Sequence, residues 1–149
     1  RDIFADKLIV MLLYPGDFWI SGNTPSSKNS KVWTGKMLIS SKAVTKWLQQ
    51  TEMEFQMQSP LFVEALSNLV PPYNIEFTFY RKSKHNFDYN NVSQIVTDTM
   101  KSHGWIEDDN ANIIKPYYAD YVYSKNKPGV LIRILTNKPN HNYERNQNQ

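Results

Sequence analysis

Residues 91–103 place their hydrophobic side chains at the three- and four-residue spacing of an α-helix. One face of this predicted helix carries Val92, Ile95, Val96, Thr99, Met100 and His103, and the opposite face carries Asn91, Gln94, Asp98 and Lys101. We expect Asp88 or Asn90 to cap its N-terminus, because short polar side chains accept hydrogen bonds from the first backbone N–H groups. Gly104 is expected to close its C-terminus.

The same spacing predicts a longer helix over residues 41–58. Its apolar side is expected to consist of Ala43, Val44, Trp47, Leu48, Thr51, Met53 and Phe55. Pro60 is expected to begin a separate short helix that runs to Leu69, since proline cannot donate a helical hydrogen bond. The Pro71-Pro72 pair is then expected to end this second helix.

Apolar and polar residues alternate over residues 73–82, which predicts a half-buried strand with Tyr73, Ile75, Phe77 and Phe79 on one face. Four further strands are predicted at Leu8–Tyr14, Phe18–Ile20, Ile113–Tyr123 and Val130–Leu135. Pro116 indicates an edge position or a bulge. The turn at residues 126–129 favours a hairpin between the last two strands. Residues 37–39 are either a short strand or the lead into the long helix.

The chain has 149 residues and a mass of 17.5 kDa, which suits a single domain with its own core. We expect residues 1–136 to form this domain and residues 137–149 to be a polar tail that is too poor in apolar residues to pack. The predicted fold class is α/β, with a small mixed sheet of about four to six strands. The helices at 41–58 and 91–103 are expected to pack on this sheet.

Composition narrows the choice of function. The chain has no cysteine, so disulfides and thiolate metal sites are excluded, and we expect a cytoplasmic protein. The apolar run Leu8–Tyr14 is too short to cross a membrane, and it lacks the cleavage site of a signal peptide. The net charge is only +3, so any nucleic-acid surface has to be a local basic patch.

Five acidic residues gather between positions 88 and 109, namely Asp88, Asp98, Glu107, Asp108 and Asp109. Taken singly, they are typical of a helix cap, a solvated helix surface and a turn. Taken together, they indicate a site for a divalent cation, because carboxylates that repel each other are held together mainly when a cation lies between them.

The order and spacing of three segments are specific. They are Asp88-Tyr89-Asn90-Asn91-Val92-Ser93-Gln94, Asp98-Thr99-Met100 and Gly104-Trp105-Ile106-Glu107-Asp108-Asp109. This pattern resembles the signature of RusA-type crossover junction endodeoxyribonucleases, the Holliday junction resolvases of many phages and prophages. The resemblance covers residues 18–136 and is strong only over residues 88–109. It departs from the family at Asn90 and Gln94, where an aspartate and a lysine are usual.

The resemblance implies a RusA-like homodimer in the cytoplasm of a bacterial host, encoded by the host or by a phage. It implies that this dimer uses Mg²⁺ to cut four-way DNA junctions, with Mn²⁺ as a substitute. It implies that the catalytic residues are Asp88, Asn90, Gln94 and Asp109, and that the metal ligands are Asp88, Asn90, Asp108 and Asp109. Which of the two adjacent aspartates is the primary ligand stays open at this point. Asp88 and Asp109 alone satisfy the one or two carboxylates that Mg²⁺ commonly uses.

DNA contacts are expected from two polar segments. Arg81, Lys82, Lys84 and His85 form a basic run directly before Asp88, and the loop at residues 22–36 is rich in Lys, Ser and Asn. The predicted DNA-binding residues are Lys28, Asn29, Lys31, Arg81, Lys82, Lys84 and Asn91. The ordinary alternative is that both segments are solvated loops.

Two other functions compete with junction cleavage. The first is a branched-DNA-binding protein of the same fold that has lost catalysis, because Asn90 lacks a negative charge and Gln94 cannot neutralise a phosphate. The second is an α/β domain in which the motif is a coincidence. We expect Asn90 to be a tolerated natural variant, since Gln94 departs from the pattern together with it.

Overall fold

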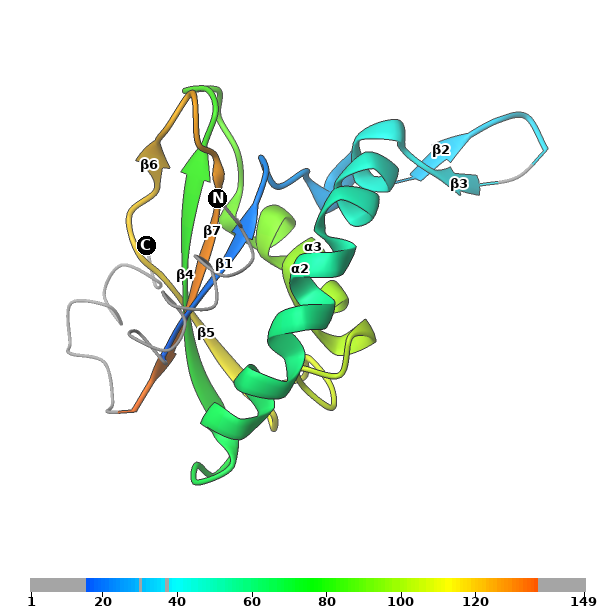
Figure 1. Cartoon of the computed structure of the whole chain (residues 1–149). Coiled ribbons are helices and arrows are strands. Elements are labelled where there is room, and N and C mark those ends of the chain that lie inside the picture. Colours follow the sequence, from blue (N-terminus) through cyan, green and yellow to red (C-terminus); the bar gives the residue numbers. More distant parts are fainter. Residues whose placement is uncertain (1–15, 30, 37, 137–149) are drawn as a thin grey trace.

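The computed structural model describes residues 16–29, 31–36 and 38–136. The predicted strand Leu8–Tyr14 and the predicted tail 137–149 lie outside these ranges. The described chain is a mixed sheet with two helices on one side of it (Figure 1), so the predicted α/β class is confirmed. None of its helices is long and apolar enough to cross a membrane.

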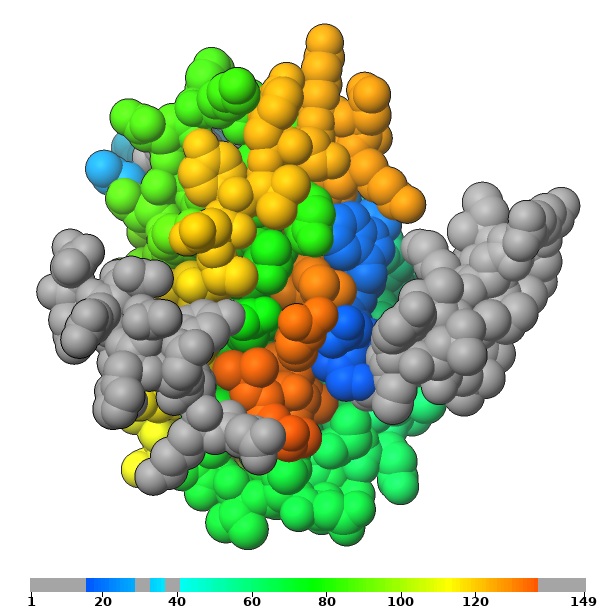
Figure 2. Space-filling view, turned by 90° about the vertical axis from the view of Figure 1, so that its left-hand side faces the viewer, coloured from blue at the N-terminus to red at the C-terminus, as the bar shows by residue number. Residues whose placement is uncertain are grey.

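The main sheet has five strands, and four of them lie in the order β1-β7-β4-β5. Their bounds are β1 Asp17–Ser21, β7 Gly129–Leu135, β4 Tyr73–Arg81 and β5 Ile114–Tyr118. The short β6, Val122–Tyr123, also pairs with β4. Figure 2 shows this order from the side away from the helices, as neighbouring blue, orange, green and yellow bands.

The pairing of β5 corrects one prediction. β5 and β6 run parallel to β4, whereas β7 pairs antiparallel with both β4 and β1. The predicted hairpin between β5 and β7 is therefore wrong, because β4 lies between these two strands. A parallel pair needs a crossover connection, and the helix α3, Tyr89–Ser102, supplies it between β4 and β5. Pro116 lies on the edge strand β5, as its missing N–H requires.

The helix α2 spans Lys42–Leu66 without a break, so the predicted division at Pro60 is wrong. Ser41 caps it, since its Oγ accepts from the backbone N–H of Val44 at 3.3 Å. Its buried residues are Val44, Trp47, Thr51, Phe55, Gln58, Phe62 and Leu66. This stripe continues on both sides of Pro60, so core packing outweighs the roughly 3 kcal/mol that proline costs inside a helix. Ala43, Leu48 and Met53 were expected in the stripe but are exposed.

The loop predicted at residues 22–36 contains short regular elements, and a further short strand follows it. The short 3-10 helix η1, Ser27–Asn29, lies beside α3. The strands β2, Lys31–Trp33, and β3, Leu38–Ser40, pair antiparallel and extend from the body of the molecule as a separate hairpin (Figure 1). Of the two alternatives for residues 37–39, the short strand is therefore the one observed for Leu38 and Ile39.

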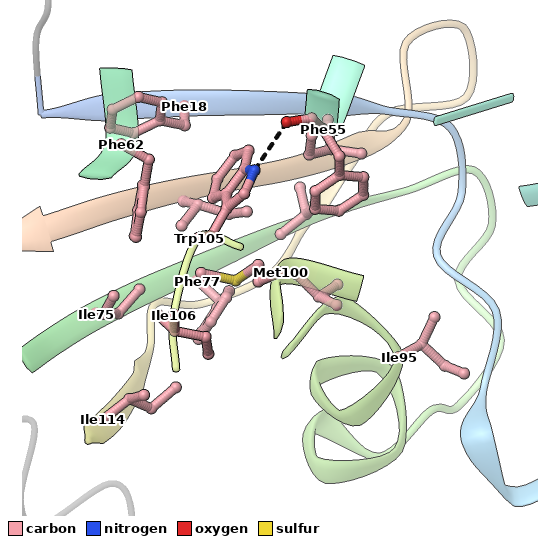
Figure 3. Packing of buried hydrophobic residues seen from close by; sticks show 14 of the residues in the cluster. Phe18, Phe55, Phe62, Ile75, Phe77, Ile95, Met100, Trp105, Ile106 and Ile114 are labelled. Carbon is pink, nitrogen blue, oxygen red and sulfur yellow. Dashed lines mark hydrogen bonds between the residues drawn. The ribbon is translucent and has the colours of Figure 1, made fainter. Parts of the chain in front are cut away.

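The core lies between the helices and the sheet, and Trp105 is near its centre (Figure 3). The indole is 1% exposed and contacts the rings of Phe18, Phe55 and Phe62. Its Nε1 donates a hydrogen bond of 2.8 Å to the backbone oxygen of Phe55 in α2. One residue just after α3 thus joins the crossover segment to the long helix and to β1.

Candidate functional site

The acidic segment belongs to the crossover between the parallel strands β4 and β5. Asp88 is the N-cap of α3 in its backbone conformation, with φ −103° and ψ 129°, as one of the two predicted capping alternatives requires. Its side chain does not cap the helix: Oδ2 accepts from Nδ2 of Asn91 at 3.1 Å, and no backbone N–H of the described helix donates to it. The carboxylate is exposed and is therefore accessible to a ligand.

The way in which α3 ends determines the positions of the acidic residues that follow it, Asp108 and Asp109. Gly104 has φ +77°, and its N–H donates to the carbonyl of Lys101 at 3.1 Å. The N–H of Trp105 donates to the carbonyl of Met100 at 2.9 Å. These two bonds form a Schellman motif, so the predicted closure of the helix by Gly104 is confirmed. Trp105 and Ile106 are both buried and anchor the chain before it returns along α3.

The side chain of Asp109 contacts the middle of α3. The side-chain amide of Gln94 donates to Oδ2 of Asp109 at 3.1 Å and to Oδ1 of Asp98 at 2.8 Å. Gln94 and Asp98 are one helical turn apart on the exposed face of α3, as the sequence pattern predicts. A single neutral amide thus holds two carboxylates side by side.

The Asp109 carboxylate affects the protonation of Asp98. Partial burial raises the pKa of Asp98 above its usual value, and the neighbouring Asp109 carboxylate raises it further, while the hydrogen bond from Gln94 opposes both effects. A raised pKa means that the ionised form is less stable here than in water. A bound cation would relieve the same repulsion between the two groups.

Asp108 points to a different set of partners. Its Oδ1 lies 3.2 Å from Nζ of Lys101 and accepts the backbone N–H of Asp109 at 2.8 Å. Its Oδ2 accepts from Nδ2 of Asn110 at 3.0 Å. The hydrogen bonds from Asp109, Lys101 and Asn110 lower the pKa of Asp108 to about 2. These contacts make Asp108 the residue that shapes the turn, whereas Asp109 faces the helix.

The structure does not bring all the predicted metal ligands together. Gln94 lies six residues after Asp88, which corresponds to about 9 Å along the helix. Asp109, which contacts Gln94, is therefore displaced along α3 from Asp88. Among the residues that the structure describes, no three His, Asp or Glu side chains are grouped so that they could hold a metal ion. Asn90 is exposed in the first turn of α3.

The basic run before α3 divides into two parts. The Nη1 of Arg81 donates to the backbone oxygen of Thr24 at 2.6 Å, and its guanidinium lies 4.6 Å from the centre of the Phe87 ring. Burial lowers the pKa of Arg81. Lys82 and Lys84 are exposed, and Nζ of Lys84 lies 5.2 Å from the centre of the Tyr123 ring. Arg81 thus fixes the 22–24 loop, while the two lysines face solvent.

The segment between β4 and α3 is held by a group of aromatic rings. Phe87 contacts Tyr89 and Tyr121 edge-on, with centroid distances of 5.3 and 5.1 Å. Tyr89 stacks on Tyr118 at 5.1 Å, and its hydroxyl oxygen accepts from the backbone N–H of Tyr121 at 3.1 Å. This group sets the position of the adjacent Asp88, since Phe87 and Tyr89 lie on either side of it in the sequence.

The predicted DNA-binding residues of the N-terminal loop are partly described. Lys28 is exposed in η1, which lies beside α3, and its backbone N–H donates to Oγ of Ser26 at 3.2 Å. The backbones of Asn29 and Lys31 belong to η1 and β2, but their side chains lie outside the described part of the chain. Asn91 is half-buried and is engaged with Asp88.

Asp98 was one of the five clustered acids but was not among the predicted catalytic residues or metal ligands. It belongs to the motif and to the exposed face of α3, but a single exposed helical aspartate is most often solvated. One feature of the sequence could have indicated its role: Asp98 lies four residues after Gln94, on the same face of the helix. From there the Gln94 amide can contact both Asp98 and the turn that contains Asp109. The partner across space, Asp109, could be assigned only once the path of the chain after Gly104 was known.

Comparison with known proteins adds no family: no protein-family model and no curated protein matches this chain.

Proposed function

We propose that this protein is a Mg²⁺-dependent endodeoxyribonuclease that cuts four-way or branched DNA junctions. One observation carries the proposal: two carboxylates, Asp98 and Asp109, are held side by side at the surface on the same helix that Asp88 begins. The motif resemblance over residues 88–109 supplies the reaction and the substrate.

The donor set fits the proposed cation. Mg²⁺ prefers oxygen ligands and is commonly bound by one or two carboxylates together with water and substrate phosphate. Asp109 and Asp98, which one amide holds side by side, would supply these carboxylates. Asp88 lies further along α3 and is a ligand that the motif resemblance implies, and the amide oxygens of Asn90 and Gln94 are further possible oxygen ligands. When bound, the ion lowers the pKa of a water molecule and stabilises the negative charge that develops on the phosphate.

The residues of the chain have separate tasks in this proposal. Gln94 positions Asp109 by donating to it, and a cation on the same carboxylate oxygen would compete with this hydrogen bond. The contacts of Asp108 with Lys101 and Asn110 fix the turn that presents Asp109. Lys82 and Lys84 lie at the exposed start of the same crossover, where they can contact DNA phosphates.

The test is cleavage of a labelled four-way junction with and without Mg²⁺. We expect paired nicks only with Mg²⁺. Asp88→Asn and Asp109→Asn should each abolish cleavage, because each removes a charge that holds the ion. Junction binding should be unchanged or tighter in both variants, since repulsion from the phosphates is reduced. Glu107→Gln is the matched control, because Glu107 is an exposed acid of the same segment. Cleavage at the wild-type rate by either aspartate variant would refute the ligand assignment.

The hydrogen bonds of the Gln94 side-chain amide also favour a second function. Gln94 holds Asp98 and Asp109 together without a cation, so the arrangement is compatible with a protein that binds branched DNA but does not cut it. In that case the junction is bound with the same salt dependence, and no nicks appear with Mg²⁺ or Mn²⁺. Binding without cleavage therefore distinguishes the second function from the first.

A further inference from the structure

The end of β4 and the turn that leads into β7 lie side by side, although they are far apart in the sequence. Arg81 of β4 is paired with Tyr123 of β6, and the backbone N–H of Ser124 donates to the carbonyl of Arg81 at 2.7 Å. Figure 1 shows both segments at the top of the molecule, and in Figure 2 the green and orange surfaces again lie together there. The residues that follow β4 and those that precede β7 therefore share one surface.

This surface carries four exposed lysines. Lys82 and Lys84 follow β4, and Lys125 and Lys127 lie in the turn before β7. None of the four forms an ion pair with a carboxylate in the part of the chain that the structure describes, so their charges are available to an anionic ligand. Because the net charge of the whole chain is only +3, this surface is a local concentration of positive charge, as nucleic-acid binding requires.

Two exposed aromatic rings lie next to these lysines. Tyr121 is 42% exposed and Tyr123 is 47% exposed. The Nζ of Lys84 lies 5.2 Å from the centre of the Tyr123 ring, so a cation and an aromatic face already contact each other. The Tyr121 ring is held edge-on by Phe87, with a centroid distance of 5.1 Å. We call the six exposed residues the basic–aromatic patch, which consists of Lys82, Lys84, Tyr121, Tyr123, Lys125 and Lys127.

The chemistry of the basic–aromatic patch fits an unpaired nucleic-acid strand. Lysine side chains bind phosphates, and exposed aromatic rings stack on nucleobases of any sequence. In a duplex the faces of the bases are covered by their neighbours, so only an unpaired strand can use both kinds of group. An acidic peptide would pair with the lysines but would leave the tyrosine rings without a stacking partner.

We propose that the basic–aromatic patch binds an unpaired DNA strand, with phosphates on the lysines and bases stacked on Tyr123 and Tyr121. The backbone N–H of Tyr121 donates to the hydroxyl of Tyr89, so the basic–aromatic patch adjoins the first turn of α3, which Asp88 begins. An unpaired strand of a branched substrate would thus run beside the proposed cleavage site. The inference rests on the proposed function only for the phosphate contacts of the two lysines after β4, and it needs no bound cation.

The first test measures binding of a fluorescently labelled oligothymidylate of about 12 nucleotides, a length within the range of single-strand sites. Anisotropy is recorded in EDTA, so that no metal-dependent cleavage takes place. We expect Tyr123→Ala to weaken the affinity about tenfold, because it removes a ring on which a base stacks. The slope of log affinity against log salt should stay unchanged, since no charge is removed. Tyr123→Phe is the matched control and should bind as the wild type does, because its ring can stack in the same way.

A blunt duplex of the same length separates stacking from charge. Tyr123→Ala should bind this duplex as the wild type does, because the paired bases do not expose their faces. The proposal is overturned if the wild type does not bind the oligothymidylate, or if Tyr123→Ala binds it as tightly as the wild type. It is also overturned if Tyr123→Ala loses affinity for the duplex to the same extent.

The second test concerns the two lysines that only the fold brings to this surface. Lys125→Ala/Lys127→Ala should flatten the salt slope for the oligothymidylate by about 1.4, since each phosphate contact of a single strand contributes about 0.7. The control Lys42→Ala/Lys46→Ala removes the same charge from exposed positions of α2, which contacts β1 at the other edge of the sheet, and should leave the slope unchanged. An unchanged slope in the first double variant, or equal flattening by both, would overturn the proposal.

A competition experiment separates a nucleic acid from an acidic peptide. Unlabelled oligothymidylate should displace the labelled strand much more effectively than oligoglutamate of equal charge, because oligoglutamate has no bases to stack. Equal displacement by both competitors would mean that the basic–aromatic patch recognises negative charge alone, and would overturn the proposal. None of these measurements depends on cleavage, so a failure to bind the single strand and a failure to cut the junction are distinguished.

Discussion

At the scale of single residues, the site depends on which groups carry charge. Asn90 occupies a position where the resembling family usually has aspartate, and it is exposed in the first turn of α3. Asp88, Asp98 and Asp109 already place three carboxylates along or against this helix. A fourth charge at this position is therefore expected to add little to the binding of one divalent ion.

We predict that Asn90→Asp changes the rate of Mg²⁺-dependent junction cleavage only modestly, because the existing carboxylates supply enough charge. Cleavage rates of the two proteins under the same conditions provide the measurement. A missing ligand would behave differently, since its return would raise the rate by about a hundredfold or more. An inactive starting protein that gains strong activity from Asn90→Asp would show that this residue is a lost ligand.

Asp98 connects the site to the stability of the fold. Its pKa is raised in the folded state, chiefly by burial and then by Asp109, so its ionised form destabilises the folded protein. This contribution is absent below its ordinary value of 3.8 and grows as pH rises from there through the folded-state pKa. At neutral pH this destabilisation is fully present.

Asp98→Asn is therefore expected to increase the free energy of unfolding at pH 7 by about 0.5 kcal/mol, the scale of surface charge interactions. Its side-chain oxygen can still accept the hydrogen bond from Gln94. Denaturant unfolding at neutral and at acidic pH is the measurement, and the difference between the two proteins should vanish in acid. A variant that is less stable at pH 7 would mean that Asp98 is stabilising in its ionised form.

At the scale of elements, the turn after α3 determines where Asp108 and Asp109 emerge. A Cβ atom on Gly104 would have Oγ of Ser59 as its nearest neighbour, at 4.0 Å, so the space for a side chain exists. The constraint is the backbone, because φ +77° is unfavourable for residues other than glycine.

We predict that Gly104→Ala lowers the free energy of unfolding by about 1 kcal/mol and that Gly104→Asn lowers it less, since asparagine tolerates this conformation better. Gly16→Ala is the control, because Gly16 has no positive φ and a Cβ there would have only ordinary contacts. Denaturant unfolding of the three variants is the measurement. Equal losses for Gly104→Ala and Gly16→Ala would contradict the assigned role of the backbone.

At the scale of the whole molecule, the basic groups that face solvent are expected to set the affinity for DNA. Arg81 is engaged with Thr24 and Phe87, so Lys82 and Lys84 remain as the exposed lysines of the run. Each phosphate contact releases a counterion and contributes about 0.9 to the slope of log affinity against log salt.

Replacing Lys82 and Lys84 with Ala should therefore flatten this slope by about two. Affinities for a four-way junction over a range of salt concentrations give the measurement. Arg81→Ala is expected to lower stability instead, because it breaks a half-buried contact with the 22–24 loop. An unchanged slope in the double lysine variant would indicate that DNA contacts the loop that contains Lys28 instead.

The sequence by itself determined the elements whose signals are local. The period of α3, the alternation of β4 and the turn at Gly104 depend on residues within one segment, and all three agree with the structure. Neighbouring residues along one helix or strand are enough to decide such features, because the repeat of each element is short.

Tertiary structure decided what depends on distant residues. α2 continues through Pro60 because Phe62 and Leu66 extend its buried stripe, and β5 pairs with β4 because α3 forms the crossover between them. Asp109 lies beside Asp98 because the chain runs back along α3 after Trp105, which is anchored in the core. In each case the competing local preference was outweighed by packing between segments, which a pattern within one segment does not contain.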